Sequence, residues 1–405
     1  MRNASEKLWT KDFVIMSIIN FINMIIFYLL MVTMASYAVK EYHASVSQAG
    51  LVAGIYIVGT LLGRIVTGRI INKVGTKKIL MIGLILFPIT MSFYFIQAGI
   101  IVLIISRLVN GFAVGIASTA TSTVVAQILP TSRKGEGIGY FSMSSTLGTA
   151  IGPFFGLLLS QHTTYFVIFM LCMVFAILAL VCALFAKISK IQAHTVQEEK
   201  GFHISQFIDG KALPISILTL LFALGYASLI AFLNFFAEER DLLSASSFFF
   251  LAYAIAVLLT RPFTGRLMDT KGANYIVYPC AILFGAGLIL LSISHSAFLL
   301  LLSGAIIGIG FGNISSAFQA LSIKVTTPEK VGLATSTYFI GLDIGLGFGP
   351  YFLGYLVPSL GYSNLYVWLG IFMFVLIVFY LFLHGRKDHL VVNKNEIRLK
   401  EIAPN

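Results

Sequence analysis

Charged side chains are scarce in this 405-residue chain, making up 11% of it, whereas a soluble globular domain carries about 25%. Hydrophobic residues make up 58%, and the mean hydropathy is +0.94. Cysteine is also rare, and Cys172, Cys182 and Cys280 fall inside apolar runs without the spacing of a disulfide framework or a metal site. These shortages argue against a soluble fold or a disulfide scaffold, and they predict a protein with no metal and no cofactor.

The motifs of common enzyme classes are missing as well. No H-E-x-x-H, G-x-S-x-G, C-x-x-C or phosphate-binding Walker segment stands in a usable context, and no polar stretch is long enough for a catalytic domain. We therefore expect no enzyme, and a membrane receptor or membrane-embedded enzyme is kept only as an alternative from another class. The net charge of +11 does not predict a nucleic-acid partner, because the basic residues lie between apolar runs.

Twelve apolar runs are each long enough to cross a bilayer, which takes about 20 residues of helix. They lie at 13–37, 47–70, 79–97, 99–128, 136–160, 164–186, 212–237, 244–268, 275–294, 297–325, 330–357 and 363–384. Only helices and closed barrels satisfy the backbone in lipid, and these runs are not the alternating segments of a barrel. The first run lacks a cleavage pattern and is expected to be retained as a span. The predicted fold class is an all-α membrane protein with twelve transmembrane helices.

The basic residues predict the orientation of these spans. Of the 27 Lys and Arg residues, three lie inside spans, Lys40 and Arg240 lie in loops on one side, and the remaining 22 lie on the other side. Such a bias marks the cytoplasmic side. Both termini and the central polar segment are therefore expected in the cytoplasm. The spans themselves are expected to have membrane lipid as a partner.

The chain repeats itself at an offset of 197 residues. The segment LLGRIVTGRIINKVGTK (61–77) aligns without gaps with LLTRPFTGRLMDTKGAN (258–274), and Gly148, Gly152 and Pro153 map onto Gly345, Gly349 and Pro350. The repeat predicts a six-helix bundle over 1–186, a cytoplasmic linker over 187–211, a second bundle over 212–384 and a cytoplasmic tail over 385–405. Parallel repeats of this kind place the substrate site between the halves near the bilayer midplane.

These repeated segments resemble the major facilitator superfamily over nearly the whole chain. The loop signature of that family, G-x-x-x-D-[RK]-x-G-[RK]-[RK], is present in two copies, although the first copy has Asn72 in place of the acid. The resemblance implies a cytoplasmic gate at Gly68, Asn72, Lys73 and Gly75 in the first copy and at Gly265, Arg266, Asp269 and Gly272 in the second. Arg64 and Arg261 lie a turn from the cytoplasmic ends of their spans and are expected to be gate or packing residues. Taken singly, these glycines and basic residues are also typical of a tight turn on the cytoplasmic side.

The fifth span resembles a motif that the family associates with antiport. It contains Gly139, Gly148, Gly152, Pro153 and Gly156, with Leu157 in place of the last glycine of the motif. Glycines four residues apart form a groove for close helix approach, and a proline permits a bend. Together with Arg261–Asp269 and Gly341–Gly345, this resemblance points to the bacterial drug:proton antiporter branch, and ordinary small-residue packing is the alternative.

Only one of the 16 acidic residues, Asp343, lies deep within a predicted span. An ionised Asp at a helix centre costs about 2.5–3.5 kcal/mol on insertion scales, so such residues usually mark an ion or proton path. Asp343 lies about 200° around the helix from Gly341, away from the small-residue face formed with Gly345 and Gly349. We expect Asp343 to carry the coupling proton, with Arg107 of the fourth span as its counter-charge. A static bond of Asp343 and a purely structural role of Arg107 are the alternatives.

Amides and aromatic residues inside spans are the candidates for the substrate cavity. An amide in lipid is costly unless it is paired, so these residues are expected to face the interior. The candidates are Asn20, Asn23, Phe27, Tyr28, Asn110, Tyr226, Asn234, Asn313, Gln319 and Tyr338. Each of them alone is equally well explained as a contact between helices. The first span has no acid, unlike many exporters of cationic drugs in the family, which favours a neutral or weakly charged amphiphile.

The function predicted is proton-coupled efflux of a small amphiphilic solute or drug by alternating access. The alternative is uptake of a nutrient by proton symport or facilitated diffusion. We expect a monomer in a bacterial cytoplasmic membrane, with small molecules and protons as its partners.

Overall fold

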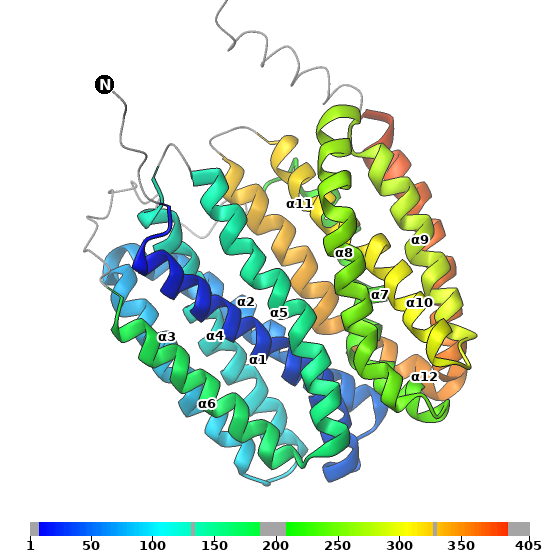
Figure 1. Ribbon diagram of the computed structural model, residues 1–405, viewed down its shortest axis with the longest axis horizontal. Coiled ribbons are helices and arrows are strands. Elements are labelled where there is room, and N and C mark those ends of the chain that lie inside the picture. The colour runs from blue at the N-terminus through cyan, green and yellow to red at the C-terminus, as the bar shows by residue number, and fades with distance from the viewer. Residues whose placement is uncertain (1–7, 131–133, 187–207, 327–329, 388–405) are drawn as a thin grey trace, which may run out of the picture. The chain divides into compact units, whose positions relative to one another are not determined.

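The computed structural model describes residues 8–130, 134–186, 208–326 and 330–387, and all regular elements in these ranges are helices (Figure 1). Two compact units divide the chain, unit 1 over Met1–Glu198 and unit 2 over Glu199–Asn405. Unit 1 contains α1 (Lys11–Tyr42), α2 (Val46–Val74), α3 (Thr76–Met91), η1 (Ser92–Phe95), α4 (Ile100–Ile128), α5 (Lys134–His162) and α6 (Tyr165–Leu184). Unit 2 contains α7 (Leu213–Glu239), α8 (Leu243–Lys271), α9 (Asn274–Ser292), α10 (Ala297–Ile307), η4 (Gly308–Gly312), α11 (Asn313–Lys324), α12 (Val331–Leu383) and η6 (Gly385–Lys387). Most of the predicted linker and tail lies outside the described residues.

Short polar or glycine-containing segments end the long helices. The Ser45 hydroxyl accepts a hydrogen bond from the amide of Gln48, and the Gln48 side chain accepts one from the Ser45 amide, which forms a capping box at the start of α2. Gly75 ends α2 with φ +97°, and Gly272 ends α8 with φ +96°. Both values suit glycine far better than other residues. The two glycines are 197 residues apart, so the repeat extends to backbone conformation.

Eleven helices in the described part of the chain are long and apolar enough to cross a membrane, whereas the sequence predicts twelve spans. The difference lies in α12, whose apolar part runs over Leu333–Leu383, 51 residues. Gly361 interrupts it with φ +71° and ψ +165°, which are not helical values. A count of twelve requires the two arms of α12 to be separate spans, and it stays a prediction.

Contacts along α12 show that its two arms run in opposite directions. At the start of the first arm, the Thr337 hydroxyl accepts a hydrogen bond from the amide of Asp209, just before α7 begins. At the bend, the ring of Tyr362 stacks on the ring of Phe235, near the end of α7. In the second arm, the Tyr380 hydroxyl donates to Asn274, where α9 begins. Because α8 connects α7 to α9 and returns the chain to the end where α7 began, the second arm of α12 leads back to that end. Each arm exceeds the length of about 20 residues that a bilayer requires.

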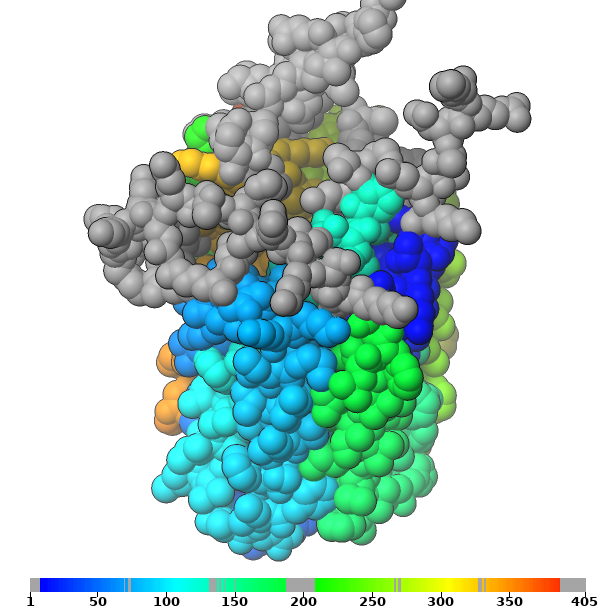
Figure 2. Space-filling model, turned by 90° about the vertical axis from the view of Figure 1, so that its left-hand side faces the viewer, coloured from blue at the N-terminus to red at the C-terminus, as the bar shows by residue number. Residues whose placement is uncertain are grey.

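Apolar side chains cover the outer surface of the helices. Figure 2 shows a face of unit 1 formed largely by α3 and α6. On α6, Phe166, Val174 and Leu184 are each more than half exposed. A soluble protein rarely leaves such a large contiguous apolar surface open. Hydrocarbon is the environment that this surface fits.

The same glycine contacts hold the helices together in both units. A Cβ on Gly111 of α4 would overlap the carbonyl of Tyr56 on α2, and a Cβ on Gly308 would overlap the carbonyl of Tyr253 on α8. Gly308 follows Gly111 by 197 residues, and Tyr253 follows Tyr56 by the same number. Helix pairs therefore approach closely at equivalent points of the two units, which supports the internal repeat independently of the loop motif.

Candidate functional site

Arg107 of α4 is fully buried and bound to α2. Its Nε donates to the carbonyl of Val52 at 3.1 Å, and its Nη2 donates to the carbonyl of Ala53 at 3.3 Å. Its guanidinium carbon lies 4.4 Å from the ring centroid of Tyr56, in cation–π geometry. The described hydrogen bonds of Arg107 all stay within unit 1. This arrangement corresponds to the structural alternative for Arg107, and its predicted role as counter-charge of Asp343 remains untested.

A polar chain continues from Arg107 toward α3. Arg107 Nη1 donates to the hydroxyl of Tyr94 at 3.4 Å, and that hydroxyl donates to Oδ1 of Asn110 at 3.0 Å. Asn110 Nδ2 donates to the Thr90 hydroxyl at 2.9 Å and to the Phe87 carbonyl at 3.3 Å. Asn110, predicted to line the cavity, is thus bonded between helices. No sequence pattern points to Tyr94, because an aromatic residue near a helix end has no distinguishing spacing.

The two amides of α1 differ in their bonding. Asn20 Nδ2 donates to the hydroxyls of Ser144 and Ser145 on α5, at 2.8 Å each. Asn23, one turn later, is 1% exposed, and within the described residues neither its amide nitrogen nor its amide oxygen has a hydrogen-bond partner. Asn20 therefore connects α1 to α5, whereas Asn23 carries unused hydrogen-bonding capacity.

Aromatic rings cluster close to Asn23. The ring centroid of Phe27 lies 4.7 Å from that of Tyr28 and 5.4 Å from that of Tyr56. Phe27 follows Asn23 by four residues, so the two side chains share a face of α1. The hydroxyl of Tyr56 is also buried without a hydrogen-bond partner among the described residues. Two of the predicted cavity residues are thus neighbours, and Tyr56 joins them.

The glycines of the antiporter-like motif lie on the face of α5 that meets α1. A Cβ on Gly148 would come within 2.4 Å of the Met24 side chain, and one on Gly152 within 2.7 Å of the Tyr28 side chain. Gly156, one turn further on, meets α1 in the same way. The expected groove for close helix approach is present, and Pro153 lies inside the same helix. Gly139 belongs to the same helix, but its surroundings lie outside the described residues.

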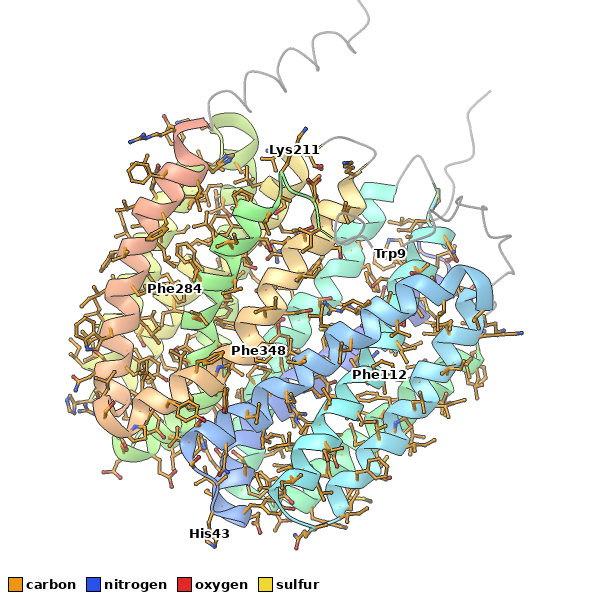
Figure 3. All side chains as sticks on the ribbon, turned by 180° about the vertical axis from the view of Figure 1, so that it is seen from behind. Trp9, His43, Phe112, Lys211, Phe284 and Phe348 are labelled. Carbon is orange, nitrogen blue, oxygen red and sulfur yellow. The ribbon has the colours of Figure 1, made fainter. Side chains whose placement is uncertain are left out.

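Asp343 lies in the first arm of α12 and is 8% exposed. On this arm, Gly341 meets Ser216, Gly345 meets Leu220, and Gly349 meets Ala227. All three partners belong to α7, so the predicted small-residue face is the α7 contact. With about 100° per residue, Asp343 points roughly to the opposite side of the helix from that contact. Figure 3 shows this arm, on which it labels Phe348.

The remaining cavity candidates of unit 2 are divided between bonded residues and aromatic contacts. Asn313 Nδ2 donates to the Thr260 hydroxyl at 2.9 Å, and its Oδ1 accepts from Thr264 at 2.7 Å, which joins α11 to α8. The Tyr338 hydroxyl donates to the Ser315 carbonyl at 2.9 Å.

The ring of Tyr226 stacks on that of Phe311 at 4.6 Å. Phe311 belongs to η4, a π-helical turn that no sequence pattern predicted. Such turns occur frequently at functional sites. Asn234 is buried on α7, and Gln319 is half-buried on α11.

The gate motif is described only in part. Gly68 and Gly265 have open space around them, unlike the packed glycines. Arg64 and Arg261 are half-buried. The side chains of Arg69, Asn72, Lys73, Arg266 and Asp269 lie outside the described residues, so their predicted gate contacts stay predictions.

A buried acid that the sequence assigned to a loop organises one end of unit 2. Asp209 is 5% exposed, its Oδ1 accepts a hydrogen bond from the amide of Lys211 at 2.8 Å, and its Oδ2 accepts one from the Thr326 hydroxyl. Burial alone would raise the pKa of Asp209, but the hydrogen bonds from Thr326 and the backbone, together with the charge of Lys330, lower the pKa below its usual value. Figure 3 shows Lys211 at that end of the unit. Asp209 thus joins the start of α7 to the segment between α11 and α12.

The family model for the Major Facilitator Superfamily matches residues 16–322 and, in a second match, 215–403. The chain belongs to the Major Facilitator Superfamily. It is therefore a multi-pass membrane protein and a secondary transporter of this superfamily type, and not an enzyme. The overlapping matches agree with the internal repeat, because one model aligns with both parts of the chain.

Relatives in the superfamily include characterised and uncharacterised transporters. An uncharacterized MFS-type transporter of Methanocaldococcus jannaschii is 25% identical over 351 residues, 84% of this chain and 90% of the relative. Multidrug resistance protein 1 of Bacillus subtilis is 23% identical over 324 residues, 77% of this chain and 81% of the relative. Quinolone resistance protein NorA of Staphylococcus aureus is 27% identical, but only over 117 residues, 29% of this chain and 30% of the relative.

Solved structures of superfamily members share the fold. A nucleoside transporter, NupG, aligns with a TM-score of 0.77 at 13% identity, covering 92% of this chain and 99% of its own. A POT family transporter in complex with 5-aminolevulinic acid aligns with a TM-score of 0.75 at 16% identity, covering 92% and 96%. Identities this low show the superfamily fold and leave the solute open.

Proposed function

We propose that this superfamily member exports a small amphiphilic solute in exchange for protons, by alternating access. The observation that carries the proposal is Asp343, a buried carboxyl group in the middle of a membrane-spanning arm. Ionising a carboxyl group in such a place is energetically unfavourable. Ionisable residues inside membrane spans therefore typically occur where a proton is loaded and released. We propose that Arg107 holds α4 against α2 in unit 1. Its role as counter-charge of Asp343 is the second hypothesis to test.

The direction of transport is supported by the α5 motif and by the resistance proteins among the relatives. The close α1–α5 contact at Gly148, Gly152 and Gly156 has the spacing that resembles the antiporter motif. Each proton that moves inward gains about 2.3 kcal/mol per 100 mV of membrane potential, so exchange for protons can drive efflux uphill. We place the protein in a bacterial cytoplasmic membrane as a monomer, with both termini in the cytoplasm.

The experiment uses everted membrane vesicles that contain the full chain, with chloramphenicol as the uncharged solute and ethidium as a cationic comparison. An interior-acid pH gradient should drive solute into such vesicles if the protein is an antiporter, whereas a symporter would move solute out. Asp343→Asn should abolish gradient-driven accumulation and preserve solute exchange at equal pH. The control is Glu41→Gln, which removes an exposed carboxylate at the end of α1 and should leave accumulation unchanged. Undiminished accumulation in Asp343→Asn would rule out the coupling role.

A further inference from the structure

We infer that Asn23 is the polar anchor for the solute, and that the solute is an uncharged molecule with a hydrogen-bond donor next to an acceptor. The inference rests on the proposed transport function and adds a substrate class to it. Its basis is the difference in bonding between two amides on one helix.

The first step concerns what α1 does with its two buried amides. Asn20 has partners on α5, the hydroxyls of Ser144 and Ser145, and its role is therefore to join helices. Asn23 is at least as buried, yet neither end of its amide has a partner among the described residues. Burying an amide without hydrogen bonds destabilises a fold. The presence of Asn23 in this state therefore indicates a role other than stabilising the protein.

The second step concerns which solute groups can form hydrogen bonds with both ends of an unpaired amide. The carboxamide of Asn23 offers an oxygen that accepts and a nitrogen that donates. A solute amine offers only donors when charged, and a carboxylate offers only acceptors. A solute that satisfies both ends of Asn23 at once has a donor and an acceptor side by side, as in a carboxamide, a lactam, a ureido group or the imide edge of a nucleobase.

The third step concerns the surroundings of that amide. Phe27 shares the face of α1 with Asn23, and its ring contacts those of Tyr28 and Tyr56. The Tyr56 hydroxyl supplies a second buried polar group without a partner in the described part of the chain. Aromatic rings bind planar apolar groups well. The solute is therefore expected to carry its amide-like group on an aromatic or otherwise apolar body.

The fourth step concerns charge. In the sequence of α1 the acids are Asp12 in the first turn and Glu41 in the last turns, so neither lies near Asn23. Arg107 contacts this cluster through the ring of Tyr56, and it already donates to two carbonyls and to Tyr94. A charged solute would thus gain little from its charge beside Asn23, and an uncharged one loses less hydration on entering.

The test compares Asn23→Leu with Asn20→Leu in the purified full chain in lipid nanodiscs. Chloramphenicol, an uncharged aryl-bearing amide, and benzamide are the probes, and the readouts are the Tm of the free protein and the Kd of each probe. Leucine has nearly the shape of asparagine but no hydrogen-bonding groups. Asn23→Leu should raise the Tm and weaken the Kd at least about tenfold, whereas Asn20→Leu should lower the Tm and leave the Kd within about twofold.

Several outcomes would overturn the inference. A wild-type Kd in Asn23→Leu would remove Asn23 from the site. A fall in Tm as large as that of Asn20→Leu, or loss of folding in both Asn23→Leu and Asn23→Ala, would show that the amide is satisfied inside the protein. Failure of the wild type to bind either amide, while a pH gradient still drives ethidium accumulation, would overturn the substrate class and leave proton-coupled export standing. Asn23-dependent amide binding without gradient-driven transport would support the inference and overturn the coupling.

Discussion

The guanidinium carbon of Arg107 lies over the ring of Tyr56, 4.4 Å from its centroid, and this contact joins α4 to α2. The carbonyls of Val52 and Ala53 bind the same side chain from the preceding turn of α2. A planar group that donates in several directions and stacks at the same time has no equivalent in lysine. Arg107 therefore acts as a structural link whatever else it does.

Arg107→Lys is expected to destabilise the protein by about 1–3 kcal/mol, because at least one buried acceptor loses its donor and the stacking is weakened. Thermal unfolding in detergent measures the effect. Transport by the folded fraction separates the two roles proposed for Arg107. An unchanged Tm together with lost proton coupling would contradict the structural role and favour the counter-charge.

Close helix approach at Gly111 and Gly308 gives a second prediction. Alanine at either position would place a methyl group against a backbone carbonyl of the facing helix, which cannot move aside as a flexible side chain can. We expect Gly111→Ala and Gly308→Ala each to cost about 1–3 kcal/mol, the usual range for overpacking.

The matched control is Gly68→Ala, because nothing lies within 4 Å of a Cβ at Gly68 and its position is helical. There, alanine should stabilise by about 0.5–1 kcal/mol by removing the entropy of a helical glycine. Chemical or thermal unfolding of the three variants gives the comparison. Equal effects at Gly68 and Gly111 would contradict the packing argument.

The sequence was most informative where one physical rule dominates. Hydrocarbon demands long apolar helices, and the observed helices follow the predicted runs up to the bend at Gly361. Duplication was readable because the glycines that permit close approach, and those with positive φ, must be glycine in both copies. Gly75 and Gly272 are the clearest pair.

Polar bonding was harder to predict because an amide between two helices and an amide facing a solute look alike in a sequence. Asn20 and Asn23 had the same interpretation, yet only the structure shows that Asn20 bonds to Ser144 and Ser145. The sequence predicts a polar loop at Asp209, because its hydrogen-bond donor Thr326 lies 117 residues further along the chain and nothing in the local sequence points to it. Arg107 and Asp343 also do not follow the repeat, since the positions 197 residues from them are Gly304 and Thr146.

Orientation in the membrane gives a third prediction, based on the ends of unit 1. Trp9 and His43 lie at opposite ends of this unit (Figure 3). The distribution of basic residues predicts that the end with Trp9 faces the cytoplasm. In intact cells, His43→Cys should react with a membrane-impermeant maleimide, and Lys78→Cys at the start of α3 should react only after the cells are opened.

The wild-type chain serves as the blank in this labelling, because Cys172 and Cys280 are buried and Cys182 is partly buried. Labelling of Lys78→Cys in intact cells, without labelling of His43→Cys, would reverse the proposed orientation.

The lowered pKa of Asp209 gives the last prediction, a dependence of stability on pH. A carboxyl group whose pKa is lower in the folded state than in the unfolded state, where it is about 3.9, stabilises the fold when ionised. This contribution is fully present above the unfolded-state pKa, and it is lost as the pH falls through the folded-state pKa.

Asp209→Asn should therefore lower stability by about 1 kcal/mol at pH 7, and the difference from wild type should shrink as the pH falls toward 3. Taking the difference cancels the other carboxyl groups, since they titrate in both proteins. Thr326→Val keeps the carboxyl group but removes its hydroxyl donor, which brings the folded-state pKa of Asp209 closer to its unfolded-state pKa, so the stability lost in acid should be smaller in that variant than in wild type. Thermal unfolding between pH 7 and pH 3 tests both, and a difference between wild type and Asp209→Asn that grows in acid would contradict the sign argued here.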